Sequence, residues 1–324
     1  MSTHPSRPFP TTPLARLTGH SGPVHAVTFS AGSGQYILTG SQDRQIRLFN
    51  PVSSKLIQTY SAHGYEVLDL AVSADNARFA SGGGDKTVFV WDVASARTVR
   101  RFVGHVGRVE SVAFGGEGDA VVVSGSFDGT VRLWDTRGGG GGGGGGGKAV
   151  MVLGEAKDAV SCVKVRGAEI FAGSVDGRVR VYDLAMGRVE VDCLGTAGVT
   201  SVMPTLLGDC CLVSTLDSTL RLMDRPTGKC LQTFRAAEFR NETYRVRSTL
   251  GMADAVVISG GEDGRVFVWD VLSGEVLHRL RHRKDDGDGA GKGEVVSAVA
   301  WNQMRMQWAS AGGDGEVVVW GMGD

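Results

Sequence analysis

The sequence predicts an all-β protein in which seven four-stranded sheets close into one ring, a β-propeller. Three observations predict it. A short motif recurs seven times along the 324 residues, at intervals of 41 to 51 residues. Each copy alternates apolar and polar residues on either side of a turn, which is the pattern of paired strands. The chain also has 49 glycines, and this excess over the typical ~7% of residues implies many turns.

The repeated motif consists of a strand that ends in a small residue, a turn rich in Gly and Asp, and a second strand such as residues 130–134. A further strand precedes it, of the type "VHAVTF" or "VESVAF", and another follows it, of the type "KLIQTY" or "RTVRRF". Each unit therefore has four strands. The copies are "LTGSQDRQIRLFN", "ASGGGDKTVFVWD", "VSGSFDGTVRLWD", "FAGSVDGRVRVYD", "LVSTLDSTLRLMD", "ISGGEDGRVFVWD" and "ASAGGDGEVVVWG", and they align on Asp43, Asp85, Asp128, Asp176, Asp217, Asp263 and Asp314.

The two ends of the sequence predict how the ring closes. Residues 13–20, "PLARLTGH", have the pattern of a fourth strand with no unit before it, while "VVVWGMGD" at the other end lacks a fourth strand. We expect the N-terminal strand to complete the last blade, because an open sheet edge is a liability. The predicted organisation is a mobile tail over residues 1–12 and one propeller over 13–324, with long loops at 138–147 and 281–293.

Composition excludes several classes of function. Lys plus Arg is 34 and Asp plus Glu is 35, so no overall field attracts nucleic acid or an acidic membrane. The five cysteines form no C-x-x-C pair, which argues against zinc and against a disulfide framework. No apolar stretch approaches the ~18 residues of a membrane helix. We expect no metal, no cofactor, no sequence-specific nucleic acid binding and no membrane association.

The period, the strand count and the Gly-His and Trp-Asp pairs resemble the WD-repeat β-propellers over nearly the whole chain. That resemblance implies a structural network of His, Ser or Thr, Asp and Trp inside a blade. In the second blade the set is His63, Ser81, Asp85 and Trp91, and in the third it is His105, Ser124, Asp128 and Trp134. The first blade has Phe49 in place of Trp, and the fourth has Ala172 and Tyr182 and lacks the histidine.

A serine, a histidine and an aspartate could instead form a hydrolytic site. An enzyme needs only one such site, whereas here the set recurs, and no G-x-S-x-G elbow accompanies it. We therefore predict no catalytic residue.

Three segments are similar to the mitogen-activated protein kinase organiser family of WD-repeat proteins. They are "HGYEVLDLAVSADNARFASGGGDKTVFVWDVAS" (63–95), "AGSVDGRVRVYDLAMG" (172–187) and "LVSTLDSTLRLMD" (212–224). The resemblance implies a non-enzymatic scaffold, in a kinase cascade or in the spliceosome during pre-mRNA splicing. It also implies kinase-cascade or spliceosomal protein partners, a monomer within larger complexes, and a location in cytoplasm and nucleus. A substrate receptor of a ubiquitin ligase is the alternative.

One candidate docking patch stands out on the predicted ring. Tyr65 and Glu66 follow the Gly-His loop of the second blade, and the fold does not demand an aromatic there. Phe127 directly precedes Asp128 in the turn of the third blade, near Arg108. Because these loops and turns should emerge at one end of the ring, we expect the four side chains to form a partner-binding patch. The alternative is that Tyr65 packs on the neighbouring blade.

Overall fold

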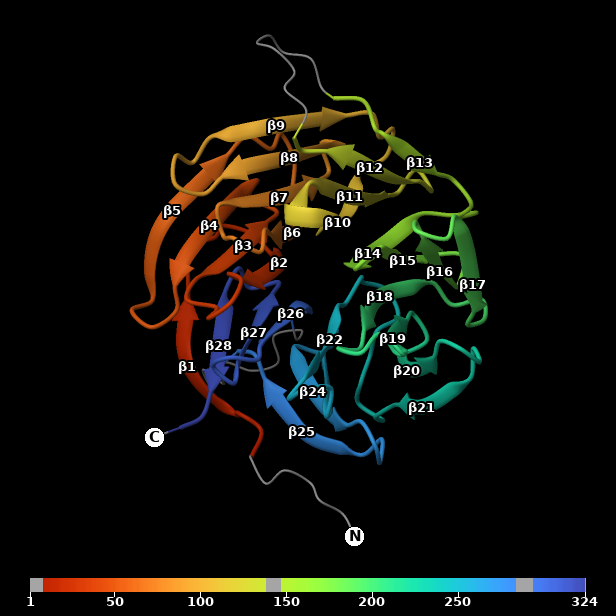
Figure 1. The fold of residues 1–324 in the computed structure, drawn as a ribbon. Coiled ribbons are helices and arrows are strands. Elements are labelled where there is room, and N and C mark those ends of the chain that lie inside the picture. The colour runs from red at the N-terminus through yellow and green to blue at the C-terminus, as the bar shows by residue number, and fades with distance from the viewer. Residues whose placement is uncertain (1–7, 138–146, 284–293, 324) are drawn as a thin grey trace.

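Seven antiparallel sheets of four strands each surround a common axis (Figure 1). The structure is a computed structural model that describes residues 8–137, 147–283 and 294–323. The predicted all-β, seven-bladed propeller is confirmed. Within the described residues no helix is long and apolar enough to cross a membrane.

The strands follow the chain in order, so that each of the first six blades is built from four consecutive strands. Blade 1 has β2 (Val24–Phe29), β3 (Ile37–Ser41), β4 (Gln45–Asn50) and β5 (Lys55–Ser61), and blade 2 has β6 (Val67–Val72), β7 (Arg78–Gly83), β8 (Thr87–Asp92) and β9 (Thr98–Val103). Blade 3 has β10 (Val109–Gly115), β11 (Val121–Ser126), β12 (Val131–Asp135) and β13 (Met151–Leu153), with the 3-10 turn η1 (Glu117–Asp119). Blade 4 has β14 (Val160–Arg166), β15 (Glu169–Ser174), β16 (Arg178–Asp183) and β17 (Arg188–Cys193).

The remaining blades complete the ring. Blade 5 has β18 (Val199–Pro204), β19 (Cys210–Thr215), β20 (Thr219–Asp224) and β21 (Cys230–Phe234), and blade 6 has β22 (Ser248–Gly251), β23 (Val256–Gly260), β24 (Arg265–Asp270) and β25 (Val276–Arg281). Blade 7 combines β26 (Val296–Asn302), β27 (Gln307–Gly312) and β28 (Val317–Gly321) with β1 (Thr12–Leu17), and its strand order is β1-β28-β27-β26.

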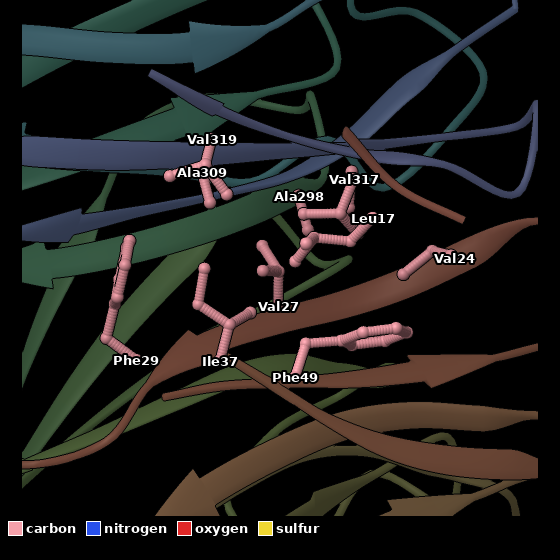
Figure 2. Close-up of a cluster of buried hydrophobic side chains, with 11 residues drawn as sticks. Leu17, Val24, Val27, Phe29, Ile37, Phe49, Ala298, Ala309, Val317 and Val319 are labelled. Carbon is pink, nitrogen blue, oxygen red and sulfur yellow. The ribbon is translucent and has the colours of Figure 1, made fainter. Parts of the chain in front are cut away.

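Ring closure by the N-terminal strand is confirmed. Strand β1 pairs antiparallel with β28, from Thr12 opposite Gly321 to Leu17 opposite Val317. Leu17 is buried in the apolar cluster between blades 7 and 1, together with Val24 and Phe49 from the first blade (Figure 2). Residues from both ends of the chain therefore share one core.

The predicted tail over residues 1–12 is too long. Phe9 is only 7% exposed, and its ring lies 6.1 Å from that of Trp301 and 5.8 Å from that of Trp308. The indole N–H of Trp308 donates to the Pro10 carbonyl at 2.8 Å. Packing thus begins at Phe9, because its ring fills a site on blades 6 and 7. The rest of the predicted tail, residues 1–7, lies outside the described residues.

The predicted long loop at 281–293 also begins later than expected. Arg281 is the last residue of β25, and His282 is buried. Residues 284–293 lie outside the described residues, as do residues 138–146 of the glycine loop predicted at 138–147.

Close approach between blades explains the glycine on the second strand of the motif. A Cβ atom added at Gly82 would lie 2.5 Å from Val109 Cγ1, and one at Gly125 would lie 2.7 Å from Val160 Cγ1. The valines begin the inner strands of the next blade. A side chain at either glycine would push adjacent blades apart, so the repeated Gly sets the spacing of the ring.

Candidate functional site

The predicted polar set of blade 3 forms one hydrogen-bonded chain. Trp134 Nε1 donates to Ser124 Oγ at 2.8 Å, Ser124 Oγ lies 2.7 Å from His105 Nε2, and His105 Nδ1 lies 2.9 Å from Asp128 Oδ2. An ionised carboxylate only accepts, so Nδ1 carries the proton and Nε2 accepts from the serine hydroxyl. The same carboxylate oxygen also accepts the Val106 N–H at 2.9 Å. The chain ties the loop before β10 to the turn after β11.

Blade 2 repeats this arrangement. Trp91 Nε1 lies 2.8 Å from Ser81 Oγ, which is 2.7 Å from His63 Nε2, and His63 Nδ1 is 2.8 Å from Asp85 Oδ2. The Gly64 N–H donates to the same Asp85 oxygen at 3.0 Å. All predicted members of each set are therefore brought together within their own blade.

The hydrogen-bonded order Asp–His–Ser is that of a hydrolytic triad, but neither serine is placed to act as a nucleophile. Ser124 and Ser81 are fully buried, and each Oγ already accepts an indole N–H. A nucleophile must face a substrate carbonyl with an oxyanion site beside it. Neither serine can do so without removing its Trp.

Electrostatics match a structural role. Burial alone would raise the pKa of the Asp128 carboxyl, but hydrogen bonds from Thr130, His105 and Val106 outweigh it and hold the pKa well below its usual range. Burial lowers the pKa of His105, against the opposing effect of Asp128. The pair is thus a carboxylate beside a neutral imidazole.

Blades 1 and 7 also hold the turn aspartate with a histidine, and these two histidines were not identified from the sequence as members of the set. Blade 1 uses His20 with Thr39 and Asp43. In blade 7, His282 Nδ1 lies 2.8 Å from Ser310 Oγ, which accepts from Trp320. The sequence predicts a long loop over residues 281–293, and that prediction hides His282 as a member of the set. The usable signal was its position within two residues of the end of an outer strand, which His63 and His105 share.

Arginine replaces the missing histidine in blades 4 and 5. Arg180 Nη2 donates to Asp176 Oδ2 at 2.7 Å, and Arg221 Nη2 donates to Asp217 Oδ2 at 2.7 Å. Each arginine lies four residues after its aspartate, and that spacing could have been read from the sequence. Blades 4 and 5 lack the histidine, but the turn aspartate of each is still paired.

The predicted docking patch lies on the face where the loops before the inner strands meet the turns of the motif, here called the upper face. The Phe127 N–H donates to the Arg108 carbonyl at 2.9 Å, and the Gly84 N–H to the Glu66 carbonyl at 2.9 Å. Tyr65 is 63% exposed and Phe127 is 56% exposed. Tyr65 is therefore not a residue that packs on the neighbouring blade.

The patch differs in detail from the prediction. The Arg108 guanidinium lies 4.9 Å from the centroid of the Phe127 ring, and its Nε pairs with Glu110 rather than with Glu66. The Glu66 carboxylate instead lies over Gly84, where an added Cβ would be 2.7 Å from Oε1. Among the described residues, the Tyr65 ring has no aromatic or cationic partner. The structure thus brings Arg108 and Phe127 together and leaves Tyr65 as a separate exposed ring.

A charged cluster that sequence reasoning missed crosses the centre of the ring. Arg245 Nη1 donates to the Ser161 carbonyl at 2.8 Å, its Nη2 donates to the Leu68 carbonyl at 3.0 Å, and it pairs with Glu110 at 3.1 Å. Arg247 pairs with Asp69, whose other oxygen accepts from Ser111 Oγ at 2.6 Å. Two arginines that precede β22 of blade 6 thereby bind the inner strands of blades 2, 3 and 4.

Asp69 had a signal in the sequence. It takes the third position of its inner strand, where Ala26, Ser111, Cys162 and Ser201 stand in other blades. A buried acid in a row of small residues predicts a buried cation. Burial alone would raise the pKa of Asp69, but Arg247 and the other nearby cations keep it lowered. No group of three or more His, Cys, Asp or Glu side chains suited to a metal occurs in the part of the chain that the structure describes.

Comparison with known proteins gives consistent matches. The family model for the WD domain, G-beta repeat, matches residues 11–50, 54–92, 96–135 and 147–183. WD repeat domain-containing protein 83 of Homo sapiens is 46% identical over 82% of this chain and 81% of its own length. Its homolog in Dictyostelium discoideum is 27% identical over 94% of this chain and 96% of that protein. Autophagy-related protein 16 of Arabidopsis thaliana is 28% identical over 96% of this chain but only 58% of its own length.

The matches and the fold agree. Each matched segment begins near an outer strand and continues through three strands of the next blade, as the seven-bladed structure requires. The chain therefore belongs to the WD-repeat protein family, and it is similar over most of its length to WD repeat domain-containing protein 83.

Proposed function

We propose that this protein is a non-enzymatic scaffold that docks protein partners on its upper face, in a mitogen-activated kinase cascade or in the spliceosome. The observation that carries the proposal is the exposure of Tyr65 and Phe127 on turns that are otherwise fixed from within. Aromatic side chains are enriched among the residues that dominate binding energy at interfaces. The resemblance to the kinase organiser family supports the two pathways.

Rigidity supports the same role. The Asp128 network fixes the turn that carries Phe127, and the Asp85 network fixes the loop that carries Tyr65. A pre-ordered loop loses little conformational entropy when a partner binds. The two rings therefore present apolar area at low entropic cost.

The test compares partners recovered by tagged wild-type protein and by the Tyr65→Ala, Phe127→Ala double variant. The double variant should lose a defined set of proteins and keep its melting temperature, because both side chains are exposed. The control carries Leu272→Ala and Met304→Ala, which remove exposed apolar side chains at turns on the opposite face. Equal recovery by all three proteins would refute docking at this patch.

The identity of the lost proteins chooses the pathway. Kinases and their adaptors would support cascade scaffolding, and small nuclear ribonucleoprotein components would support splicing. A location in both cytoplasm and nucleus is part of the proposal, and fluorescence imaging of the tagged protein tests it. Recovery of ubiquitin-ligase subunits instead would favour a substrate receptor.

A further inference from the structure

The face opposite the upper face carries an apolar cleft between blades 3 and 4. Its volume is about 660 Å³, and its lining includes Phe114, Val121, Val165, Ile170 and Leu184. These residues lie at or near the ends of strands where Gly115 pairs with Val121 and Glu169 pairs with Asp183. Phe127 follows the other end of β11. The cleft and the upper patch are thus separated by the length of a strand, about 20 Å at ~3.3 Å per residue.

Arg166 links the wall of the cleft to blade 5, where two leucines are exposed. Leu184 lines the cleft and is 40% exposed. Arg166 is the last residue of β14, directly before the turn that contributes Gly167 and Ala168 to the cleft, and its Nη2 donates to the Leu206 carbonyl at 2.8 Å. Leu206 and Leu207 are 65% and 80% exposed. We call the cleft together with Leu184, Leu206 and Leu207 the lower apolar surface.

Around the lower apolar surface, the basic side chains have partners within the chain, whereas an acidic side chain has no ion-pair partner among the described residues. The nearby basic side chains are engaged within the chain, since Arg166 binds the Leu206 carbonyl and Arg225 pairs with Glu169 at both carboxylate oxygens. In contrast, Glu117 on the rim of the cleft is exposed and makes no ion pair among the described residues.

A second acidic site borders the two leucines. Asp254 accepts the Leu206 N–H at 2.6 Å, and Asp209 accepts the Thr205 hydroxyl at 2.8 Å. Burial and then the charge of Asp209 raise the pKa of Asp254, so the two carboxylates repel one another. A cation placed between them would relieve that repulsion.

We propose that the lower apolar surface binds a segment of a protein partner in which an aliphatic side chain is flanked by arginine or lysine. The aliphatic side chain fills the cleft, and a basic neighbour pairs with Glu117 on its rim. A basic side chain further along the segment pairs with Asp254, which lies beyond Leu206 in the β22–β23 turn of blade 6. The inference rests on the proposed scaffold function in one respect: a scaffold must hold two proteins at once. Opposite faces of one rigid ring allow this without overlap.

The test uses three synthetic peptides with free termini blocked: Gly-Ser-Arg-Leu-Arg-Ser-Gly, the same peptide with Glu for both Arg, and the same peptide with Ser for Leu. Methyl-labelled full-length protein is titrated with each to about 10 mM, the range suited to single-side-chain binding. We expect the first peptide to shift the methyl resonances of Val121, Val165 and Leu184. It should bind at least about fivefold more tightly than the acidic peptide, and the Ser peptide should cause no saturable shift.

Variants localise the binding. Leu207→Ser, which removes apolar contact without adding charge, and Glu117→Lys should each weaken binding of the basic peptide about fivefold or more. The matched controls Leu272→Ser and Glu275→Lys, exposed positions of blade 6, should leave it unchanged. All four positions are exposed, and near-ultraviolet circular dichroism verifies folding. Equal effects of variants and controls, or shifts confined to other blades, would overturn the proposal.

The same experiment separates this proposal from the upper-face function. The Tyr65→Ala, Phe127→Ala variant should bind the basic peptide as wild type does, whatever partners it loses. Analytical sedimentation of the wild-type chain tests whether a second copy of the chain, instead of a partner peptide, covers this surface. If the chain dimerises and Leu207→Ser makes it monomeric, the surface is an interface between two copies and the proposed peptide partner is wrong.

Discussion

Removing strand β1 should open the ring and destabilise the whole propeller. The perturbation is deletion of residues 1–17, compared with deletion of residues 1–7, which removes only positions outside the described chain. The longer deletion leaves β28 as an open edge and uncovers the cluster in Figure 2, including Val317. The shorter deletion should leave the free energy of unfolding unchanged.

Single substitutions set the scale. Leu17 is almost completely buried, and Leu→Ala at such a site costs about 2–5 kcal/mol. Phe9 is less completely buried than Leu17, at 7% exposed, so Phe9→Ala should cost about 3 kcal/mol, the low end for buried aromatics. Deletion of 1–17 removes both side chains and the β1–β28 ladder, and should cost more than either. Domains typically have 5–15 kcal/mol of stability, so the truncated ring should be close to unfolding.

Urea unfolding followed by tryptophan fluorescence measures these differences, since Trp308 and Trp320 stack 4.9 Å apart in blade 7. A synthetic peptide of residues 8–20 added to the truncated protein should restore stability in proportion to the logarithm of its concentration. Equal urea midpoints for the two deletions would refute closure by β1. Full stability of a 1–12 deletion would refute the anchoring role of Phe9.

Three further predictions concern the polar interior. Asp128→Ala should lower the free energy of unfolding by about 1–3 kcal/mol, because the His105 N–H loses its acceptor; an unchanged urea midpoint would contradict it. Arg247→Ala should cost about 3–5 kcal/mol by leaving Asp69 buried without its cation, and adding Asp69→Asn should recover part of that loss in a double-mutant cycle. Burial lowers the pKa of His105, and burial followed by Arg245 lowers that of His25 to about 4. Below about pH 6.5 these histidines are therefore protonated in the unfolded chain but stay neutral in the folded protein, so the free energy of unfolding should decrease from pH 6.5 towards pH 4. Equal urea midpoints at pH 7 and pH 5 would contradict this.

The regular part of the fold could be predicted because one constraint is applied seven times. Alternation with period two identifies strands, and the recurring Asp turn fixes which strands pair. Gly82 and Gly125 show why the motif persists, since each admits a valine of the next blade. The hydrogen-bonded sets around His63 and His105 follow the same repeat. Each needs only contacts within one blade, and each set falls within a stretch of 30 residues or fewer, 63–91 or 105–134.

Features that depend on the closed ring could not be predicted in this way. Arg245 reaches Leu68 across 177 residues of sequence, and Arg247 reaches Asp69 across 178. Such contacts depend on which blades face one another across the axis, and a local pattern does not contain that information. Phe9 was missed for a similar reason: its partners Trp301 and Trp308 come from the other end of the chain. Position relative to the whole ring decides these contacts.

The segment "HGYEVLD" is held both by contacts within one blade and by contacts across the ring, and an exposed residue lies between them. At its start, His63 is held by Ser81 and Asp85 inside blade 2, and at its end Asp69 is held by Ser111 and Arg247 at the centre of the ring. Tyr65 lies between these two buried anchors yet is itself exposed. A loop tied at both ends pays little further entropy to present its side chain. Packing requires His63 and Asp69 but not an aromatic ring at position 65, and this is why the proposed docking role is assigned to Tyr65.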